Sequence, residues 1–146
     1  MKVRRSIWIA LIATVAFVAI AMLFVDVIPP HSMTNNRMQI CKRRILRYAK
    51  PHNRLPDSLS QTAEIPGFHY SLKDGWGNGI LYRISQNGEV TLTSLGQDNK
   101  AGGSNDDADM SGIFSAKNTD GSWSDELVEW KQDPFEQFRN QRCKQP

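Results

Sequence analysis

The sequence predicts an α+β protein with an N-terminal transmembrane helix, followed by a helix packed on a small antiparallel sheet that carries a long acidic loop. Three observations predict this: an uncharged segment near the N-terminus, an amphipathic stretch that ends at a proline, and strand-length runs joined by a tight Asn-Gly turn. The chain has 146 residues, so one membrane segment leaves room for one small domain. Three His and two Cys are too few for a zinc scaffold or a dense disulfide framework.

Charge is distributed unevenly along the chain. Residues 1–56 contain ten Lys or Arg and one Asp, whereas residues 57–146 contain eight basic and fourteen acidic residues. The overall charge of +3 therefore combines a basic front with an acidic back. This is not the uniformly basic surface that binds nucleic acid, so we expect no nucleic-acid partner.

The segment Ile7–Val25 contains no charged residue and lies between Arg4-Arg5 and Asp26. As a helix it would span about 28 Å, close to the hydrocarbon thickness of a bilayer. A cleaved signal peptide is the competing interpretation, because Ala19-Ile20-Ala21 has the small-x-small form of a cleavage site. The apolar run continues beyond that tripeptide, which favours a retained anchor.

Basic residues on both sides of this segment bear on its orientation. Lys2, Arg4 and Arg5 adjoin its N-terminal end, whereas Arg37 and the cluster at residues 42–44 lie within reach of its other end. Both groups favour the cytoplasmic side, and the closer charges usually dominate for a first helix. We therefore expect a single-pass protein of the inner membrane, with its N-terminus in the cytoplasm and its C-terminal domain in the periplasm.

An amphipathic helix is predicted after Pro29-Pro30, which cannot continue a preceding helix. Thr34 or Asn35 can cap it, and it would extend to about Lys50. Its apolar residues recur at three- and four-residue spacing and form one buried stripe: Met38, Cys41, Ile45, Tyr48 and Ala49. Its basic residues fall mostly off that stripe: Arg37, Arg43, Arg44, Arg47 and Lys50. We expect them on a solvated face, and the alternative is a contact with anionic headgroups or an acidic partner.

Beyond residue 66, short apolar runs alternate with turn residues. Phe68–Leu72 and Ile80–Ile84 are predicted strands around the glycine-rich turn at residues 74–79. Val90–Leu95 is a third predicted strand. Asn87-Gly88 joins it to the second strand, because this pair supplies the positive backbone dihedrals of a tight hairpin.

The tail is predicted to be an extension with two short helical segments. One starts near Ser124 and the other at Asp133-Pro134, an N-cap followed by a proline at the first helical position. The predicted organisation is a cytoplasmic tail (1–5), a transmembrane helix (6–28), a proline-containing linker (29–33), one domain (34–114) and a C-terminal extension (115–146).

The loop after the third predicted strand holds candidate metal ligands. Four Asp and two Asn fall within residues 98–109, and Ca²⁺ takes roughly six to eight oxygen ligands. A loop that folds back at Gly102-Gly103 would bring Asp98 against residues 105–107 and present backbone carbonyls such as that of Leu95. The alternative is an acidic surface loop without a metal, and the spacing is not that of an EF-hand.

Taken in order, these motifs resemble the major pseudopilin (protein G) of type II secretion systems. The matching residues are Tyr48, Leu55-Pro56, Asp74-Gly75-Trp76-Gly77-Asn78, Ser94-Leu95-Gly96-Gln97-Asp98, Gly102-Gly103 and Ala108-Asp109-Met110. In that family the last loop binds calcium and fixes the C-terminal part of the fold. The resemblance therefore implies a Ca²⁺ site with four best ligand candidates, namely Asp98, Asn105, Asp106 and the Leu95 carbonyl, with Asp107 next. Whether Asp109 would act as a ligand or as a turn cap stays open.

The N-terminal part departs from that family, which has a Gly before a cleavage point and a Glu five residues into the mature chain. Here the first Gly is Gly67 and the first Glu is Glu64, and Pro29-Pro30 interrupts the family's long helix. Two functions follow. One is a membrane-anchored structural component of a type II secretion or related pilus-like system, with other pseudopilins or secretion-machinery proteins as partners. The other is a stand-alone extracytoplasmic interaction module that uses the same fold without filament assembly.

No motif predicts an enzyme or a small-molecule substrate. His31, His52 and His69 have no catalytic motif around them, and neither a nucleophile signature nor a phosphate loop is present. We expect the three His to be ordinary surface or loop residues. Trp76 is expected to pack as a lid on the small core, with ligand binding as its alternative role.

Cys41 and Cys143 are the only cysteines. An oxidising periplasm would favour their pairing, which would fasten the extension to the first helix of the domain. The alternative is that Cys41 is a small core residue and Cys143 is a free thiol.

Overall fold

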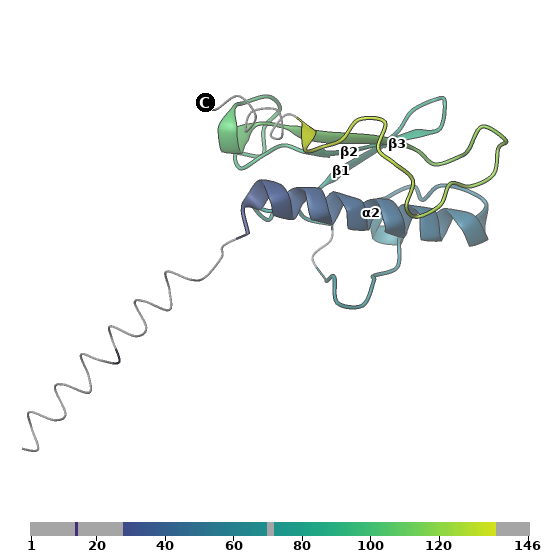
Figure 1. Ribbon diagram of the computed structural model, residues 1–146, viewed down its shortest axis with the longest axis horizontal. Coiled ribbons are helices and arrows are strands. Elements are labelled where there is room, and N and C mark those ends of the chain that lie inside the picture. The colour runs from purple at the N-terminus through teal and green to yellow at the C-terminus, as the bar shows by residue number, and fades with distance from the viewer. Residues whose placement is uncertain (1–13, 15–27, 70–71, 137–146) are drawn as a thin grey trace, which may run out of the picture.

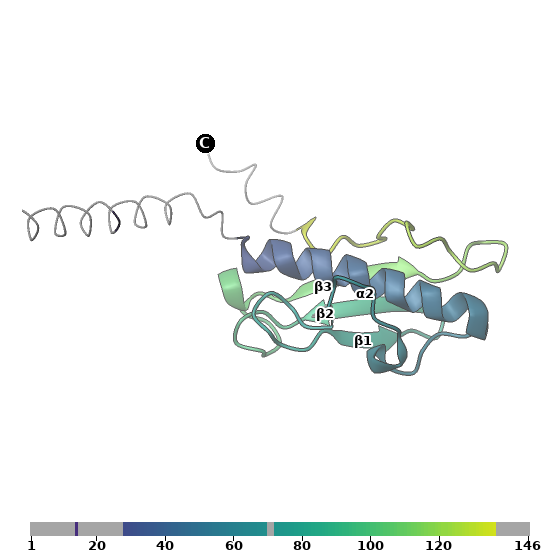
Figure 2. The same cartoon turned by 90° about the horizontal axis from the view of Figure 1, so that it is seen from below.

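One long helix, α2 (Pro30–His52), packs across one face of a three-stranded antiparallel sheet of β1 (Leu81–Ile84), β2 (Glu89–Ser94) and β3 (Met110–Ser115), as Figures 1 and 2 show. The computed structural model describes residues 14, 28–69 and 72–136. Two 3₁₀ turns, η1 (Leu59–Gln61) and η2 (Asn105–Asp107), lie in the connecting loops. The predicted α+β class is therefore confirmed for the domain.

The predicted membrane segment Ile7–Val25 lies outside the described residues, apart from Thr14. Among the residues that the structure does describe, no helix is both long and apolar enough to cross a membrane.

The helix α2 is longer at both ends than predicted. It begins at Pro30, which occupies a first-turn position where a missing N–H costs nothing, and Pro29 takes the N-cap place without a side-chain cap. Residues 30–33, expected in a linker, thus belong to the helix. At the other end Pro51 lies in the last turn, and Asn53 closes the helix in the left-handed conformation with φ of 50°.

The predicted buried stripe of α2 is confirmed for Met38, Cys41, Ile45 and Ala49, whereas Tyr48 is half-buried. The basic residues divide differently from the prediction, because Arg44 is buried as well. Its Nε donates to Thr62 Oγ1 at 3.0 Å and its Nη2 to the Thr62 carbonyl at 2.6 Å. The guanidinium is therefore satisfied by the segment after η1, and it does not lie on a solvated face.

The hairpin of β1 and β2 around Asn87-Gly88 is confirmed, with Ile84 opposite Val90 and Leu81 opposite Thr93. The described residues of the predicted strand Phe68–Leu72, which are Phe68, His69 and Leu72, are not in a strand, and residues 70–71 lie outside the described part of the chain. Directly after them, Lys73 and Gly79 form an isolated bridge across the glycine-rich turn.

Strand β3 was not predicted, and it completes the core. It pairs antiparallel with β2, with Phe114 opposite Val90 and Met110 opposite Ser94. Alternate residues of the two strands point toward α2 and are fully buried: Val90, Leu92, Met110 and Phe114.

The extension packs along α2 and beside β3, and the two helical segments predicted in it are not both formed. Near Ser124 the chain makes only a turn, in which the Val128 amide donates to the Asp125 carbonyl at 3.0 Å. The cap predicted at Asp133-Pro134 is present, since Asp133 Oδ1 accepts the Phe135 amide at 2.9 Å. The Glu136 amide donates to the Asp133 carbonyl at 3.1 Å, and Glu136, the last described residue, is helical, so the predicted segment begins here and its remainder lies outside the described residues.

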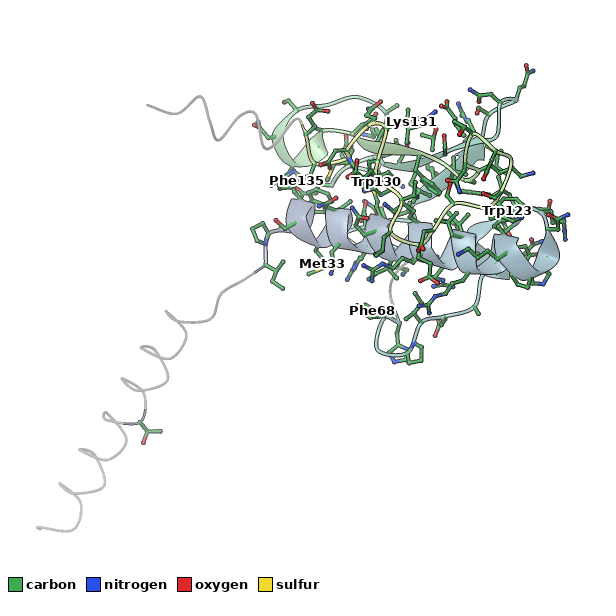
Figure 3. The ribbon with its side chains drawn as sticks, turned by 45° about the vertical axis from the view of Figure 1, so that its right-hand side comes forward. Met33, Phe68, Trp123, Trp130, Lys131 and Phe135 are labelled. Atoms are coloured by element: carbon green, nitrogen blue, oxygen red, sulfur yellow. The ribbon has the colours of Figure 1, made fainter. Side chains whose placement is uncertain are left out.

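Aromatic burial explains why the extension runs across the domain in place of folding into a separate helix. Trp130 meets Phe114 edge-on with ring centroids 5.5 Å apart, and the ammonium group of Lys42 lies 4.5 Å from the Trp130 ring centre. Lys42 also donates to the Val128 carbonyl. Beside the β3 edge, the Ile113 amide donates to the Gln132 carbonyl at 3.0 Å and its carbonyl accepts the Lys131 amide at 2.7 Å. The extension thus covers both one side of α2 and the outer edge of β3, as Figure 3 shows for Trp123, Trp130 and Phe135.

The predicted Cys41–Cys143 disulfide involves a residue outside the described part of the chain, and no disulfide is present among the described residues. Cys41 is fully buried in the core between α2 and the sheet. Burial raises the pKa of its thiol to about 12. This is the environment of a small core residue, and the disulfide stays a prediction.

Candidate metal centre

The acidic loop connects β2 to β3, and hydrogen bonds and glycine contacts close it upon itself. The Gln97 amide donates to the Asp106 carbonyl at 2.8 Å, so the two arms of the loop touch beside Asp98. Gly96 (φ 68°) and Gly103 (φ 87°) both lie directly against the backbone of Asp107. A Cβ on either glycine would come within 2.4 to 2.6 Å of that backbone, which is closer than atoms can approach. Only glycine therefore allows this closed arrangement.

The predicted ligands on the first arm are Leu95 and Asp98. Leu95 follows the last residue of β2 directly and is half-buried. Asp98 is exposed, and its Oδ1 accepts the Lys100 amide at 3.0 Å in a local turn. The side chain of Asp98 is thus oriented by its own loop and accessible to a solvated cation.

The predicted ligands on the second arm form the turn η2. Asn105 and Asp106 are exposed, Asp107 is half-buried, and Asn105 takes the left-handed conformation with φ of 54°. The Asp107 carbonyl faces Gly96 and Gly103. Asp109, whose role the sequence left open, is half-buried, and its Oδ2 accepts the Gly102 amide at 3.0 Å. At least one of its oxygens therefore caps the glycine pair.

The donor set suits a hard cation only if backbone oxygens take part. Within the described residues, no group of three or more His, Cys, Asp or Glu side chains is arranged to hold a metal ion. A transition-metal cage of side chains is therefore not formed there. Calcium also accepts backbone carbonyl and amide oxygens, and the loop that the Gln97–Asp106 bond closes offers backbone carbonyls besides the exposed Asp98 and Asp106 carboxylates. The residues present fit Ca²⁺ on these chemical grounds.

Asp74 holds the glycine-rich turn against the start of the loop. It is fully buried, and its carboxylate accepts three hydrogen bonds: from Ser94 Oγ at 2.6 Å, from the Trp76 amide at 3.0 Å and from the Asn78 amide at 2.8 Å. Ser94 is the last residue of β2, directly before the loop. A buried carboxylate with three donors is a positioning group and not a free ligand.

Asn78 extends the same arrangement into the loop itself. Its Nδ2 donates to the Gly96 carbonyl at 2.8 Å. The Asp-x-Trp-Gly-Asn motif was visible in the sequence, but its role was not, because the partners of Asp74 and Asn78 outside the motif, Ser94 and Gly96, lie 20 and 18 residues further along the chain. The turn and the loop therefore form one structural unit.

His31 was expected to be an ordinary surface or loop residue, but it is half-buried in the first turn of α2 and connects that turn to the loop, a contact that no sequence pattern indicates. Its Nε2 lies 3.3 Å from the Asn105 carbonyl and 3.7 Å from an Asp106 carboxylate oxygen. Its ring meets Trp76 edge-on with centroids 4.8 Å apart. Trp76 is half-buried and packs on His31 outside the main hydrophobic cluster, so the expectation of a lid on the core is wrong.

The backbone of the turn also contacts the start of α2. The Gly75 amide donates to Thr34 Oγ1 at 2.8 Å, and Arg37 donates to the Asp74 carbonyl. A Cβ on Gly75 would lie 2.1 Å from the Pro30 carbonyl oxygen, so this close approach also requires glycine. The start of the helix, the turn and the loop are therefore held together as one unit.

Comparison with known proteins gives a match to a family model over part of the chain. The family model described as "Type II secretion system (T2SS), protein G" matches residues 47–113. That range runs from the second half of α2 to β3 and includes the glycine-rich turn and the whole loop. It leaves residues 1–46 and 114–146 outside the match. No curated protein and no solved structure match the chain.

Proposed function

We propose that this protein, whose residues 47–113 match the protein G family of type II secretion systems, is a membrane-anchored, calcium-stabilised, pseudopilin-like structural component of such a system or of a related pilus-like machine. The observation that carries the proposal is that the family match contains both the loop and the turn that Asp74 holds against it. Pseudopilins are structural components, and we assign this chain no catalytic role.

In this proposal, the anchor is the uncharged segment at residues 7–25, with the N-terminus in the cytoplasm and the domain in the periplasm. The support is the length of the segment and the Lys2, Arg4 and Arg5 charges beside it. Partners would be the inner membrane and other pseudopilins or secretion-machinery proteins.

Calcium would be held by Asp98 from the first arm and by Asn105, Asp106 and Asp107 from the second, together with the Leu95 carbonyl. The cation would offset the mutual repulsion of these carboxylates, which oppose a closed loop when they are crowded at neutral pH. Through Asn78 and Asp74, an ordered loop would also hold the glycine-rich turn, and through His31 it would hold the first turn of α2. Calcium would therefore stabilise the domain well beyond its own ligands.

A stand-alone interaction module is the second candidate, and one structural observation favours it. Residues 28 and 29 are not helical and α2 begins at Pro30, so the helix of the domain is not continuous through the proline pair. A filament subunit of the pseudopilin kind uses one long continuous N-terminal helix, and this chain departs from that feature.

Cross-linking in native membranes distinguishes the two functions. A filament component yields a ladder of cross-linked products that contain pseudopilins, and its intact mass shows trimming at the N-terminus. A module yields an untrimmed chain without such a ladder. A reporter fused after Pro146 tests the orientation, because it should be active only outside the cytoplasm, and activity only inside would contradict the proposed topology.

A further inference from the structure

One face of α2 remains uncovered in the described structure. The sheet covers the side that carries Met38 and Ile45, the extension contacts Lys42, and the segment after η1 covers Arg44. Apart from Pro51 and His52 in its last turn, the exposed residues of α2 recur at intervals of seven, four and three, which places them on one stripe. They are Asn36, Arg43, Arg47 and Lys50. We name this stripe, together with Met33 and Phe68 beside its N-terminal end, the outer face of α2.

Apolar side chains gather at the N-terminal end of the outer face. Met33, Ile40 and Phe68 line one shallow depression of about 190 Å³ beside the polar Asn36, Arg37 and His69, and Phe68 remains 42% exposed. Figure 3 shows Met33 and Phe68 on the side of α2 that is turned away from the sheet. Ile28, two residues before the helix begins, is 60% exposed. Large apolar side chains therefore protrude at the end of α2 that follows the predicted anchor.

The rest of the outer face is basic. Residues 28–56 contain seven Lys or Arg and no Asp or Glu. Arg47 pairs with Glu126 at 2.8 Å, whereas no ion pair of Arg43 or Lys50 is found within the described part of the chain. An apolar end followed by unneutralised cations on one helix face is the pattern of a helix that lies on an anionic membrane surface.

The chain length to the predicted anchor determines which occupant can reach this face. Only residues 26–29 separate the last apolar residue of the segment from Pro30, and four residues span at most about 14 Å. The first turn of α2 therefore stays close to the bilayer interface if residues 7–25 cross it. We propose that the outer face of α2 docks on the anionic lipid headgroups of the membrane that holds the anchor, with Met33 and Phe68 at the acyl boundary and Arg43 and Lys50 on the headgroups. This inference rests on the anchor of the proposed function.

The test uses the full chain reconstituted in vesicles of phosphatidylcholine and phosphatidylglycerol at 7:3. An environment-sensitive NBD group on Cys in the variant F68C, in a C143S background, reports on the docked state, because this apolar dye takes the place of the phenyl ring. We expect blue-shifted emission that brominated lipid quenches and that is lost in pure phosphatidylcholine. The same dye in Q86C, at the exposed β1–β2 turn, should show neither effect.

Charge variants measure how much each basic residue contributes to docking. R43Q and K50Q should each lower the docking equilibrium about fivefold, the value of one basic residue near an anionic surface. R83Q, an exposed position on β1, is the matched control and should leave docking unchanged.

Three results would overturn the inference, and each has a distinct meaning. If the chain is released by alkaline carbonate, the anchor itself is absent and the proposed function loses its membrane part. If the chain is retained but the dyes at positions 68 and 86 behave alike, the anchor stands and the docked face is wrong. A blue shift that depends on protein density and resists brominated lipid would show that a second copy of the chain covers this face.

Discussion

Replacing Asp74 by alanine tests whether a buried carboxylate holds the glycine-rich turn to the loop. The change removes the acceptor of three hydrogen bonds, from Ser94 Oγ and the amides of Trp76 and Asn78, at a fully buried site. A hydrogen bond to a charged group contributes about 1.5 to 3 kcal/mol net, and bonds that share one group are not additive. We therefore expect D74A to lower the free energy of unfolding by about 3 to 5 kcal/mol, near the upper end for single substitutions.

The variant D74N is the matched control, because it keeps the shape and most of the bonds. Its remaining oxygen can accept the amides of Trp76 and Asn78, and the Ser94 hydroxyl can rotate to accept from the new amide. We expect a loss of only about 1 to 2 kcal/mol, the value of weakened bonds without an unsatisfied donor.

Urea unfolding of the full chain in detergent micelles, followed by near-ultraviolet circular dichroism of the tryptophans, measures both variants. With a denaturant slope of about 2 kcal/mol per molar, D74A should lower the midpoint by about 2 M. A D74A midpoint within about 0.5 M of the unmodified protein, or equal losses in D74A and D74N, would refute the role given to this carboxylate.

Two further predictions concern the core. G112A should destabilise the domain by about 1 to 3 kcal/mol, because the added Cβ would lie 2.7 Å from the Trp130 ring, whereas G79A meets no atom within 4 Å and should be near neutral; equal unfolding midpoints of G112A and G79A would contradict this contact. In a C143S background, Cys41 should react with a thiol reagent at pH 8 only after unfolding, because burial raises the pKa of its thiol to about 12, and rapid labelling of the folded protein would contradict its place in the core.

Local patterns predicted the elements whose signals are local. The spacing of Met38, Cys41, Ile45 and Ala49 identified the buried side of α2, and Asn87-Gly88 identified the hairpin. Strand β3 was missed although Met110 and Phe114 alternate with half-buried residues, because Gly112 interrupts the apolar alternation in a short run. The reason for a glycine at position 112 lies eighteen residues later, because the Trp130 ring occupies the space that a side chain at position 112 would need.

The errors in the extension and in α2 share a physical cause, which is tertiary contact that overrides local preference. Acidic residues after Ser124 suit a helix start. However, the Trp130 ring packs against Phe114 and the Lys131 amide donates to the Ile113 carbonyl, and these contacts hold the chain in an extended conformation. Arg44 has the composition of a surface residue, yet Thr62 satisfies it in a buried position. Neither partner can be identified from sequence spacing.

For the candidate site, the sequence located the loop and its acidic residues, and the structure added what positions them. The Asp74 carboxylate and the contact of His31 with Asp106 depend on residues distant in the chain, and the two glycines that allow closure depend on how the loop folds back on Asp107. Sequence patterns predict donor chemistry, but they do not predict which backbone carbonyls converge.

Thermal unfolding of the full chain with calcium and with chelator is the most direct test of a calcium-stabilised pseudopilin-like domain. A ligand that binds only the folded state adds about 2.7 kcal/mol at a hundredfold excess over its dissociation constant. The account predicts a clearly higher unfolding midpoint with calcium, and a much smaller calcium shift in D98A. Identical midpoints with calcium and with chelator, or an undiminished shift in D98A, would contradict it.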